Sequence, residues 1–518
     1  MNYTNPVISG FHPDPSVCRV DDDYYLVTSS FDYFPGIPIF HSKDLVNWKQ
    51  IGHVLTRESQ LPLNRVRESP VSQGIYAPTI RYHNGRFYVI TTNISTMQNF
   101  YVWAENPKGP WSEPVIIEGW MGFDPSLLFD DGKVYLTGAG LPVMEPEGIY
   151  QAEIDIESGK LLSERQLIWK GAFSSPEGPH LYKINDWYYL LIAEGGTEYG
   201  HMVTIAKSRN PYGPFESNPD NPILSNRSSK KEIQATGHAD LIQATDETWW
   251  AVFLGIRPIP GTKLHHLGRE TNLAPVNWTE DGWPIIGSSG QAEVNNDSQS
   301  LPLGRPDPWE EKEDFNNDLL SPVWNFYRNP SPDSWSLTEK PGYLTLHGQT
   351  HTLSDSASST FVGRRQQHFN CEISSLLEFK PMSEGEEAGL TVFMNGNYHY
   401  EIARTMHKGK SLIIFRRQVG SLWKVEKEIE YNEPTVVLGI EANEFNYTFT
   451  YLTADGKKEI VGLGETTLLA KEIAGGFTGV FFGMYATGNG EKSSTPAHFD
   501  YFNYRPYEDP ESYQKKFR

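Results

Sequence analysis

One phrase of sequence recurs five times in the first half of the chain, and it restricts the possible folds more than any other feature. Its first copy, residues 11–30, reads FHPDPSVCRVDDDYYLVTSS, with short β-type segments on either side of an acidic turn at 21–23. Two other copies carry Asn-Gly or Asp-Gly, at 84–85 and 131–132, which favour type I′ turns. Each copy therefore predicts a β-hairpin.

The spacing of these hairpins predicts a β-propeller. Their opening residues lie 47 to 63 positions apart: Asp14, Ala77, Asp124, Gly178 and His238. This period fits a propeller blade of four strands. A second phrase, NPKGPW at 106–111, returns two blades later as NPYGPF at 210–215, and helical periodicity is absent. We expect an all-β chain with five blades over residues 1–300.

A second domain is expected after residue 312. Residues 291–312 are polar, contain proline and lack periodicity, which indicates a connection, and we place the linker itself at 301–312. Beyond it, short alternating segments predict a β-sandwich over 313–518. The expected strands are 343–347, 371–379, 388–393, 411–416, 435–442, 447–452, 479–485 and 499–504.

The amino-acid composition limits the classes of ligand and partner that the protein is expected to bind. The formal net charge of −21 argues against nucleic acid or another phosphate-rich partner, and it fits either a neutral or cationic ligand or an acidity that only keeps the protein soluble. The 14 Trp and 27 Tyr suit either sugar binding or an aromatic β core. Cys18 and Cys371, one in each expected domain, give no disulfide framework. The first residues lack a signal-peptide pattern and no segment is long enough to span a bilayer, so we expect a cytoplasmic protein with no membrane partner.

Three carboxylates stand at matched positions of the repeat. Because the inner strands of a propeller line one channel, the residues that open them converge. Asp14 and Asp124 open two blades, and Glu177 directly precedes Gly178 in a third. Glycoside hydrolysis uses such a set: a protonated acid for the leaving oxygen, an ionised carboxylate that activates water or attacks carbon, and a neighbour that keeps the acid's pKa high. The alternative for a lone Asp before Pro is a turn-forming role.

The phrases HPDPS, GFDPSLLFDD and SSPEGPHLY, in this order, resemble glycoside hydrolase family 43. With a C-terminal concanavalin-like sandwich, the chain resembles the family's β-xylosidase and α-L-arabinofuranosidase branch. The resemblance implies an inverting enzyme with Asp14 as general base, Glu177 as general acid and Asp124 as the residue that tunes and orients the acid. It also implies that the sandwich helps to close the active site, for which 476–489 is the candidate region, with Phe481 or Phe482 as contributors.

The same resemblance implies roles for four further residues. Arg269 would bind sugar hydroxyls, Phe31 would form a wall for the sugar, and Tyr76 stands where many relatives carry Trp. His238 would bind water or a metal ion in the channel. Ordinary alternatives are an ion pair of Arg269 with its neighbour, blade packing for Phe31 and a buried core role for His238. No cofactor is expected to be required, and calcium or another divalent ion at His238 stays open.

The leading hypothesis is an exo-acting hydrolase that releases xylose from the non-reducing ends of β-1,4-xylo-oligosaccharides. α-L-Arabinofuranosidase activity, alone or alongside it, is the close alternative. Two other classes are a non-catalytic sugar-binding propeller and a structural propeller for protein partners, the second of which predicts no clustering of carboxylates. The family resemblance also implies a homo-oligomer, either a dimer or a tetramer.

Overall fold

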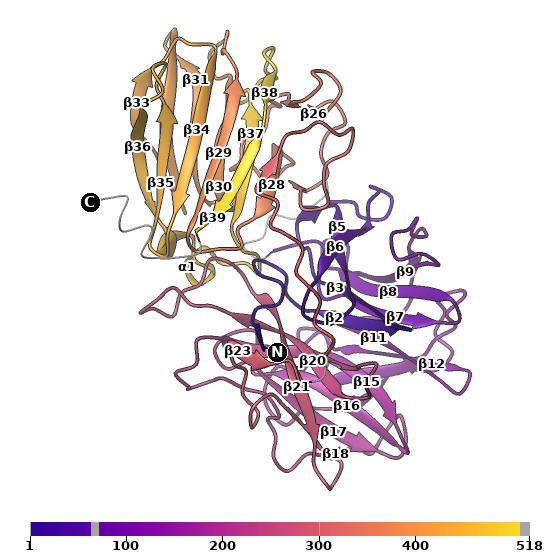
Figure 1. Cartoon of the computed structure of the whole chain (residues 1–518). Coiled ribbons are helices and arrows are strands. Elements are labelled where there is room, and N and C mark those ends of the chain that lie inside the picture. The colour runs from indigo at the N-terminus through magenta and orange to yellow at the C-terminus, as the bar shows by residue number, and fades with distance from the viewer. Residues whose placement is uncertain (1, 64–71, 300, 508–518) are drawn as a thin grey trace. The chain divides into compact units, whose positions relative to one another are not determined.

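The computed structural model describes residues 2–63, 72–299 and 301–507, and it divides into two compact units (Figure 1). The first comprises the described parts of Met1–Arg67, Gln73–Arg257 and Arg269–Asp307, and the second those of Glu68–Ser72, Pro258–Gly268 and Pro308–Arg518. Within the described residues, the helices are the short η1 (Thr466–Leu469) and α1 (Lys471–Ala474). No helix in those ranges is long and apolar enough to cross a membrane.

The first unit is a five-bladed β-propeller. Each blade is a four-stranded antiparallel sheet, and the first strands of the five blades contact one another in a ring, β2–β7–β11–β15–β19 and back to β2. The blades are β2 (Ser16–Val20), β3 (Asp23–Val27), β5 (Gly36–Ser42) and β6 (Lys49–Leu55); β7 (Thr79–His83), β8 (Arg86–Asn93), β9 (Gln98–Ala104) and β10 (Val115–Ile116); β11 (Phe123–Asp130), β12 (Lys133–Ala139), β13 (Ile149–Glu153) and β14 (Gln166–Trp169); β15 (Glu177–Ile184), β16 (Trp187–Glu194), β17 (Met202–Ser208) and β18 (Glu216–Ser217); β19 (Gln234–Gln243), β20 (Trp249–Ile256), β21 (Glu270–Trp278) and β22 (Pro284–Ile286). The short strands β1 (Asn2–Thr4), β4 (Tyr33–Phe34) and β23 (Asn295–Asp297) lie outside the blades.

The two type I′ turns predicted from the sequence, at 84–85 and 131–132, are confirmed. Asn84 and Gly85 have φ of 48° and 80°, and Asp131 and Gly132 have φ of 46° and 73°, as a type I′ turn requires. The repeated NPxGP phrase also takes one structure, since the amide of Gly109 donates to the carbonyl of Asn106 at 2.8 Å and that of Gly213 donates to Asn210 at 2.9 Å.

The propeller ring is joined by its two ends. β1 pairs antiparallel with β23, and Ile8 forms a bridge to Thr271 of the fifth blade. The buried Asn5 amide donates to the carbonyls of Leu273 at 2.8 Å and Glu293 at 3.0 Å, and its oxygen accepts from Leu273 N at 2.9 Å. Residues 295–297, within the stretch expected to be irregular, are therefore a strand of the propeller.

A polar network crosses the interior of the ring. The Asp240 carboxylate of β19 accepts hydrogen bonds from Ser16 Oγ at 2.7 Å, from Tyr182 Oη at 2.6 Å and from both terminal nitrogens of Arg81 at 2.8 and 3.1 Å. Arg81 also contacts His180 Nδ1 at 3.0 Å. These residues come from the first strands of four different blades, so one buried carboxylate ties those blades together.

The second unit is a β-sandwich, the orange and yellow strands of Figure 1. One sheet has the order β26-β27-β38-β29-β34-β35-β36, with β39 pairing to β29 and β24, and the other has the order β33-β32-β31-β30-β37-β28-β25. Phe415 and Phe449 meet between the sheets with ring centroids 4.9 Å apart. The strands are β24 (Lys312–Glu313), β25 (Asn325–Tyr327), β26 (Trp335–Ser336), β27 (Leu344–Leu346), β28 (Thr360–Arg365), β29 (Cys371–Glu378), β30 (Glu387–Asn395), β31 (Tyr398–His407), β32 (Lys410–Val419), β33 (Leu422–Glu430), β34 (Thr435–Ala442), β35 (Asn446–Leu452), β36 (Lys458–Glu465), β37 (Phe481–Thr487), β38 (Ala497–Phe499) and β39 (Phe502–Pro506).

Candidate active site

The residues that open the blades share an unusual backbone conformation. Four of the five positions have left-handed φ: Asp14 at 55°, Asp124 at 50°, Gly178 at 55° and His238 at 48°. At the last three, the pairing with the next strand shifts register beside the residue, which marks a β-bulge. A bulge redirects a side chain, and non-glycine residues held with positive φ cluster at functional sites. The repeat therefore supplies strained, matched positions at one end of the ring.

The surroundings of Asp14 favour its ionised carboxylate form. Its carboxylate accepts hydrogen bonds from Arg269 Nη1 at 2.9 Å and from Ser29 Oγ at 2.5 Å, and His238 Nδ1 lies 3.8 Å away. Burial by itself would raise the pKa of the Asp14 carboxyl, but Arg269, His238 and the Ser29 hydrogen bond outweigh it, so the pKa lies below its ordinary value. A buried carboxylate with this pKa can accept a proton from water.

The surroundings of Glu177 and Asp124, in contrast, favour the protonated carboxyl form. Burial, followed by the negative charge of Asp14, raises the pKa of Glu177 to about 7. Burial, Glu177 and Asp14 also raise the pKa of Asp124, although Gly178 N donates to its Oδ2 at 3.1 Å. The pair therefore holds at least one proton near neutral pH. Glu177, whose side chain is 20% exposed, is the more accessible of the two, since Asp124 is buried.

Two buried histidines, His238 and His201, lie beside these carboxylates. His238 sits beside Asp14 and also packs on Gly178, where a Cβ atom would come within 2.8 Å of its ring. His201 is 1% exposed, and its Nδ1 lies 3.9 Å from Glu177 Oε1. Burial lowers the pKa of His201 to about 3, so its ring is neutral.

The side chains around His238 do not suit a calcium ion, which prefers six to eight oxygen ligands. Asp14 is engaged by Arg269 and Ser29, and Asp240 by Arg81 and its neighbours. Across the described residues, no three His, Cys, Asp or Glu side chains are grouped to hold a metal ion.

The other residues expected at the site lie close to these carboxylates. Arg269 also donates to Thr197 Oγ1 at 3.0 Å, and its guanidinium lies 5.8 Å from the ring of Phe31. Phe31 in turn contacts Tyr76 with ring centroids 5.2 Å apart. Burial, followed by the negative charges of Asp124 and Asp32, raises the pKa of Tyr76. Phe31 and Tyr76 thus form an aromatic wall beside the carboxylates.

Sequence reasoning missed three polar residues of this site: Ser29, Thr197 and His201. None lies at the repeated opening position, and each is an ordinary small or polar residue of its strand end or loop. In the region 476–489, the two residues expected to contribute to the active site lie in the core of the sandwich instead. Phe481 and Phe482 are fully buried strand residues of β37, and Phe482 packs against Tyr447 and Tyr504 within the sandwich.

Comparisons with known proteins match both units. Residues 3–284 fit the model of the family "Glycosyl hydrolases family 43". The chain belongs to glycoside hydrolase family 43. Residues 312–505 fit a second model, "Beta xylosidase C-terminal Concanavalin A-like domain". The protein is therefore a glycoside hydrolase, as the sequence motifs predicted, and a propeller followed by a sandwich is confirmed.

Relatives within the family resemble the chain over nearly its full length. A non-reducing end α-L-arabinofuranosidase of Bacteroides ovatus is 45% identical, covering 97% of this chain and 94% of the relative. A xylosidase/arabinosidase of Butyrivibrio fibrisolvens is 38% identical, with 96% and 98% covered. A solved structure described as Bacteroides ovatus xyloglucan PUL GH43B superposes with a TM-score of 0.92 at 44% identity, covering 98% of this chain and 100% of that one.

Proposed function

We propose that this family 43 enzyme is an exo-acting, inverting hydrolase that removes a terminal pentose from the non-reducing end of a short oligosaccharide. The observation that carries the proposal is the contrast between Asp14, whose pKa is lowered, and Glu177, whose pKa is raised, at the openings of two blades of one ring. Two carboxyl groups with opposite protonation states are what a single-displacement hydrolysis needs.

In the proposed mechanism, Asp14 accepts a proton from the attacking water. Its hydrogen bonds from Arg269 and Ser29 fix the carboxylate and keep it ionised. Glu177 gives its proton to the leaving oxygen as the glycosidic bond breaks. Burial and the negative charge of Asp14 keep the pKa of Glu177 high, and Asp124, which is buried and interacts with Glu177, orients the acid. The Phe31–Tyr76 wall offers an apolar surface for one face of the sugar ring.

Two sugars are candidates for the released pentose. β-1,4-Linked xylose is the leading hypothesis from the sequence, and the name of the Butyrivibrio fibrisolvens relative, xylosidase/arabinosidase, includes both xylose and arabinose. α-L-Arabinofuranose is favoured by the name of the relative with 45% identity. We propose activity on one or both, without a metal cofactor, and the neutral substrate suits the acidic protein.

The decisive experiment compares the wild type, Glu177→Gln and Asp14→Asn on aryl β-xyloside, aryl α-L-arabinofuranoside and xylobiose. We expect each variant to lose about 10²- to 10⁴-fold in kcat on xylobiose or the preferred sugar. Glu177→Gln should be least impaired on an aryl glycoside whose leaving group departs without protonation. Glu153→Gln, on an outer strand of the third blade, is the matched control and should keep full activity.

Product analysis tests the remaining points. NMR soon after mixing should show the inverted anomer, and early products from xylotetraose should be xylose and xylotriose. The retained anomer, or release of internal fragments, would contradict the inverting exo mechanism. Wild-type protein inactive on every one of these substrates would contradict the pentose specificity.

A further inference from the structure

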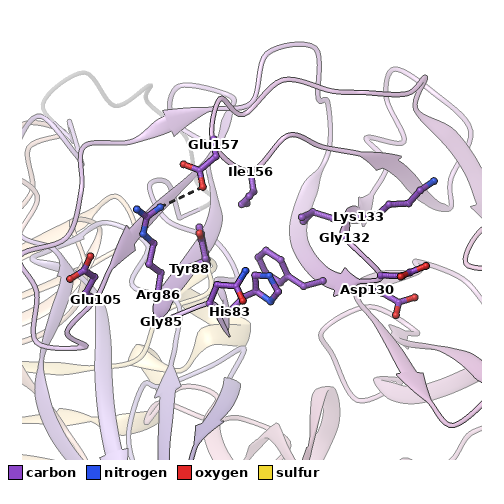
Figure 2. A pocket seen from close by; sticks show the side chains of 14 residues that line it. His83, Gly85, Arg86, Tyr88, Glu105, Asp130, Gly132, Lys133, Ile156 and Glu157 are labelled. Carbon is purple, nitrogen blue, oxygen red and sulfur yellow. Dashed lines mark hydrogen bonds and ion pairs between the residues drawn. The ribbon is translucent and has the colours of Figure 1, made fainter.

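A cleft of about 770 Å³ opens between the second and third blades (Figure 2). It lies at the turns that join β7 to β8 and β11 to β12, with residues 156 and 157 on one side. The residues that matter most to its chemistry are His83, Arg86, Glu105, Phe129, Asp130 and Glu157. All of them belong to the propeller unit.

The cleft is separate from the active site. Strand β11 begins at Phe123 and ends at Asp130, so it carries Asp124 near one end and the cleft residue Asp130 at the other. Six residues of extended chain span roughly 20 Å. A short ligand bound in the cleft therefore does not occupy the position of the reacting bond.

The floor of the cleft is aromatic. The rings of His83 and Phe129 stack with centroids 4.3 Å apart and an interplanar angle of 10°, and Phe129 packs on Tyr88 at 5.3 Å. His83 and Phe129 both line the cavity and both stay partly exposed, so the stack offers apolar surface to a ligand. A flat apolar ring surface is what the C–H face of a sugar packs against.

The rim carries more carboxylates than cations. Glu105, Asp131 and Glu157 are exposed, and Asp130 is half-buried. The two cations are already engaged, since the Arg86 guanidinium lies 4.3 Å from the Trp103 ring and 3.5 Å from Glu157, and Lys133 Nζ donates to Glu153 at 2.8 Å. The excess negative charge disfavours anionic ligands, while the carboxylates are strong acceptors for hydroxyl groups.

There is room for a ligand at the turns. A Cβ atom added at Gly85 or Gly132 would meet no atom within 4 Å, so the space in front of both turns is open. The cavity volume lies in the range of about 300–1,000 Å³ that is usual for small-molecule sites.

We propose that this cleft is a second, non-catalytic binding site for a neutral oligosaccharide. The aromatic stack would take a sugar face and the rim carboxylates its hydroxyls, while the active site at the other end of the blades stays free. The choice of pentose oligosaccharides as probes rests on the proposed function, but the cleft's preference for a neutral polyhydroxylated ligand does not.

The test uses the full chain with Glu177→Gln, which prevents hydrolysis. Calorimetric titration with xylotetraose and, separately, arabinotetraose should show two binding events for at least one probe. Adding His83→Ala, or Glu105→Arg on the exposed rim, should weaken the second event at least tenfold and leave the first unchanged. Tyr82→Ala is the matched control, because Tyr82 precedes His83 on β7, is 38% exposed and does not line the cleft. Melting temperatures of all variants verify that they are folded.

The outcomes separate this proposal from the proposed function. A single binding event with both probes up to about 10 mM, well above a Kd of 1 mM, that neither His83→Ala nor Glu105→Arg weakens would overturn the second site. A second event that neither His83→Ala nor Glu105→Arg changes would also overturn it. Two events in a protein whose wild type fails to cleave the aryl glycosides would instead support the cleft and overturn the catalytic proposal.

Discussion

Gly178 sets the position of the proposed acid. In the other blades with a left-handed opening residue, that residue itself carries the polar side chain, whereas in the fourth blade it is glycine and the carboxylate comes from Glu177. His238 occupies the space that a side chain at 178 would need. The fourth blade therefore delivers its carboxylate from one residue earlier than the first and third.

We expect Gly178→Ala to damage both stability and activity. A left-handed alanine costs about 1–2 kcal/mol, and its Cβ would displace the His238 ring, which lies beside Asp14. Gly85→Ala, with φ of 80° and no atom within 4 Å, should show the backbone cost alone. Calorimetric melting and kcat/KM measure the two effects. Full activity in Gly178→Ala would show that the His238 position is irrelevant to catalysis.

The pH profile of kcat/KM should be bell-shaped. Asp14 must be ionised, so activity rises with pH through its lowered pKa, below the ordinary value of about 3.9. Glu177 must be protonated, so activity falls as pH rises through about 7. Steady-state rates from pH 3 to pH 9 on the preferred aryl glycoside measure both limbs. An alkaline limb that persists unchanged in Glu177→Gln would assign that pKa to another group.

Among the individual site residues, those at the repeated position could be predicted from the sequence and the others could not. Asp14, Asp124 and His238 occupy one phase of a fivefold repeat, which made their convergence predictable. Ser29 and His201 occupy no such phase, and their contacts with Asp14 and Glu177 depend on how the strand ends and loops fold. The left-handed backbone of the opening residues could not be predicted either, because Asp and His adopt positive φ at only a minority of their positions.

Elements were predictable where turn residues and alternation agreed. The first hairpin was expected within 11–30, with a turn at 21–23, and its strands lie at Ser16–Val20 and Asp23–Val27. In the sandwich, β34 begins and ends where it was expected. β33 was missed because LWKVEKEIE is mostly charged and exposed, and its strand form comes from pairing with β32 at the edge of the sheet. Tertiary pairing overrode its local composition.

The connection that joins the ends of the ring predicts a measurable stability loss. Asn5→Ala removes three hydrogen bonds to Leu273 and Glu293 and leaves buried backbone groups without them, which should cost about 2–4 kcal/mol. Asn2→Ala, an exposed position on β1, should be nearly neutral. Urea unfolding, followed by the fluorescence of propeller tryptophans, measures the difference. Equal stability of the two variants would mean that the Asn5 contacts do not hold the ring closed.

A buried ion pair, Arg81 with Asp240, lies in the network that links four of the five blades. Burial would raise the pKa of Asp240, but Arg81 and His180 outweigh it and the pKa lies below its ordinary value. The pair therefore stabilises the fold above about pH 4, and this contribution is lost as the pH falls further. Asp240→Asn leaves Arg81 without a full countercharge and should cost about 3–5 kcal/mol, whereas Tyr182→Phe should cost about 1–2. Thermal melting at pH 7 and pH 3 measures both, and a Tyr182→Phe loss as large as that of Asp240→Asn would contradict this ranking.

The pairing of β1 with β23 has a consequence for biosynthesis. Residues 2–4 are synthesised before the blades, yet their partners at 295–297 follow almost three hundred residues later. Since domains fold from the N-terminus while synthesis proceeds at roughly 5–20 residues per second, the blades can form one after another while the first strand waits. The seam between the ends of the propeller is thus the last part to form, and a ribosome that stalls before residue 295 would hold an open ring.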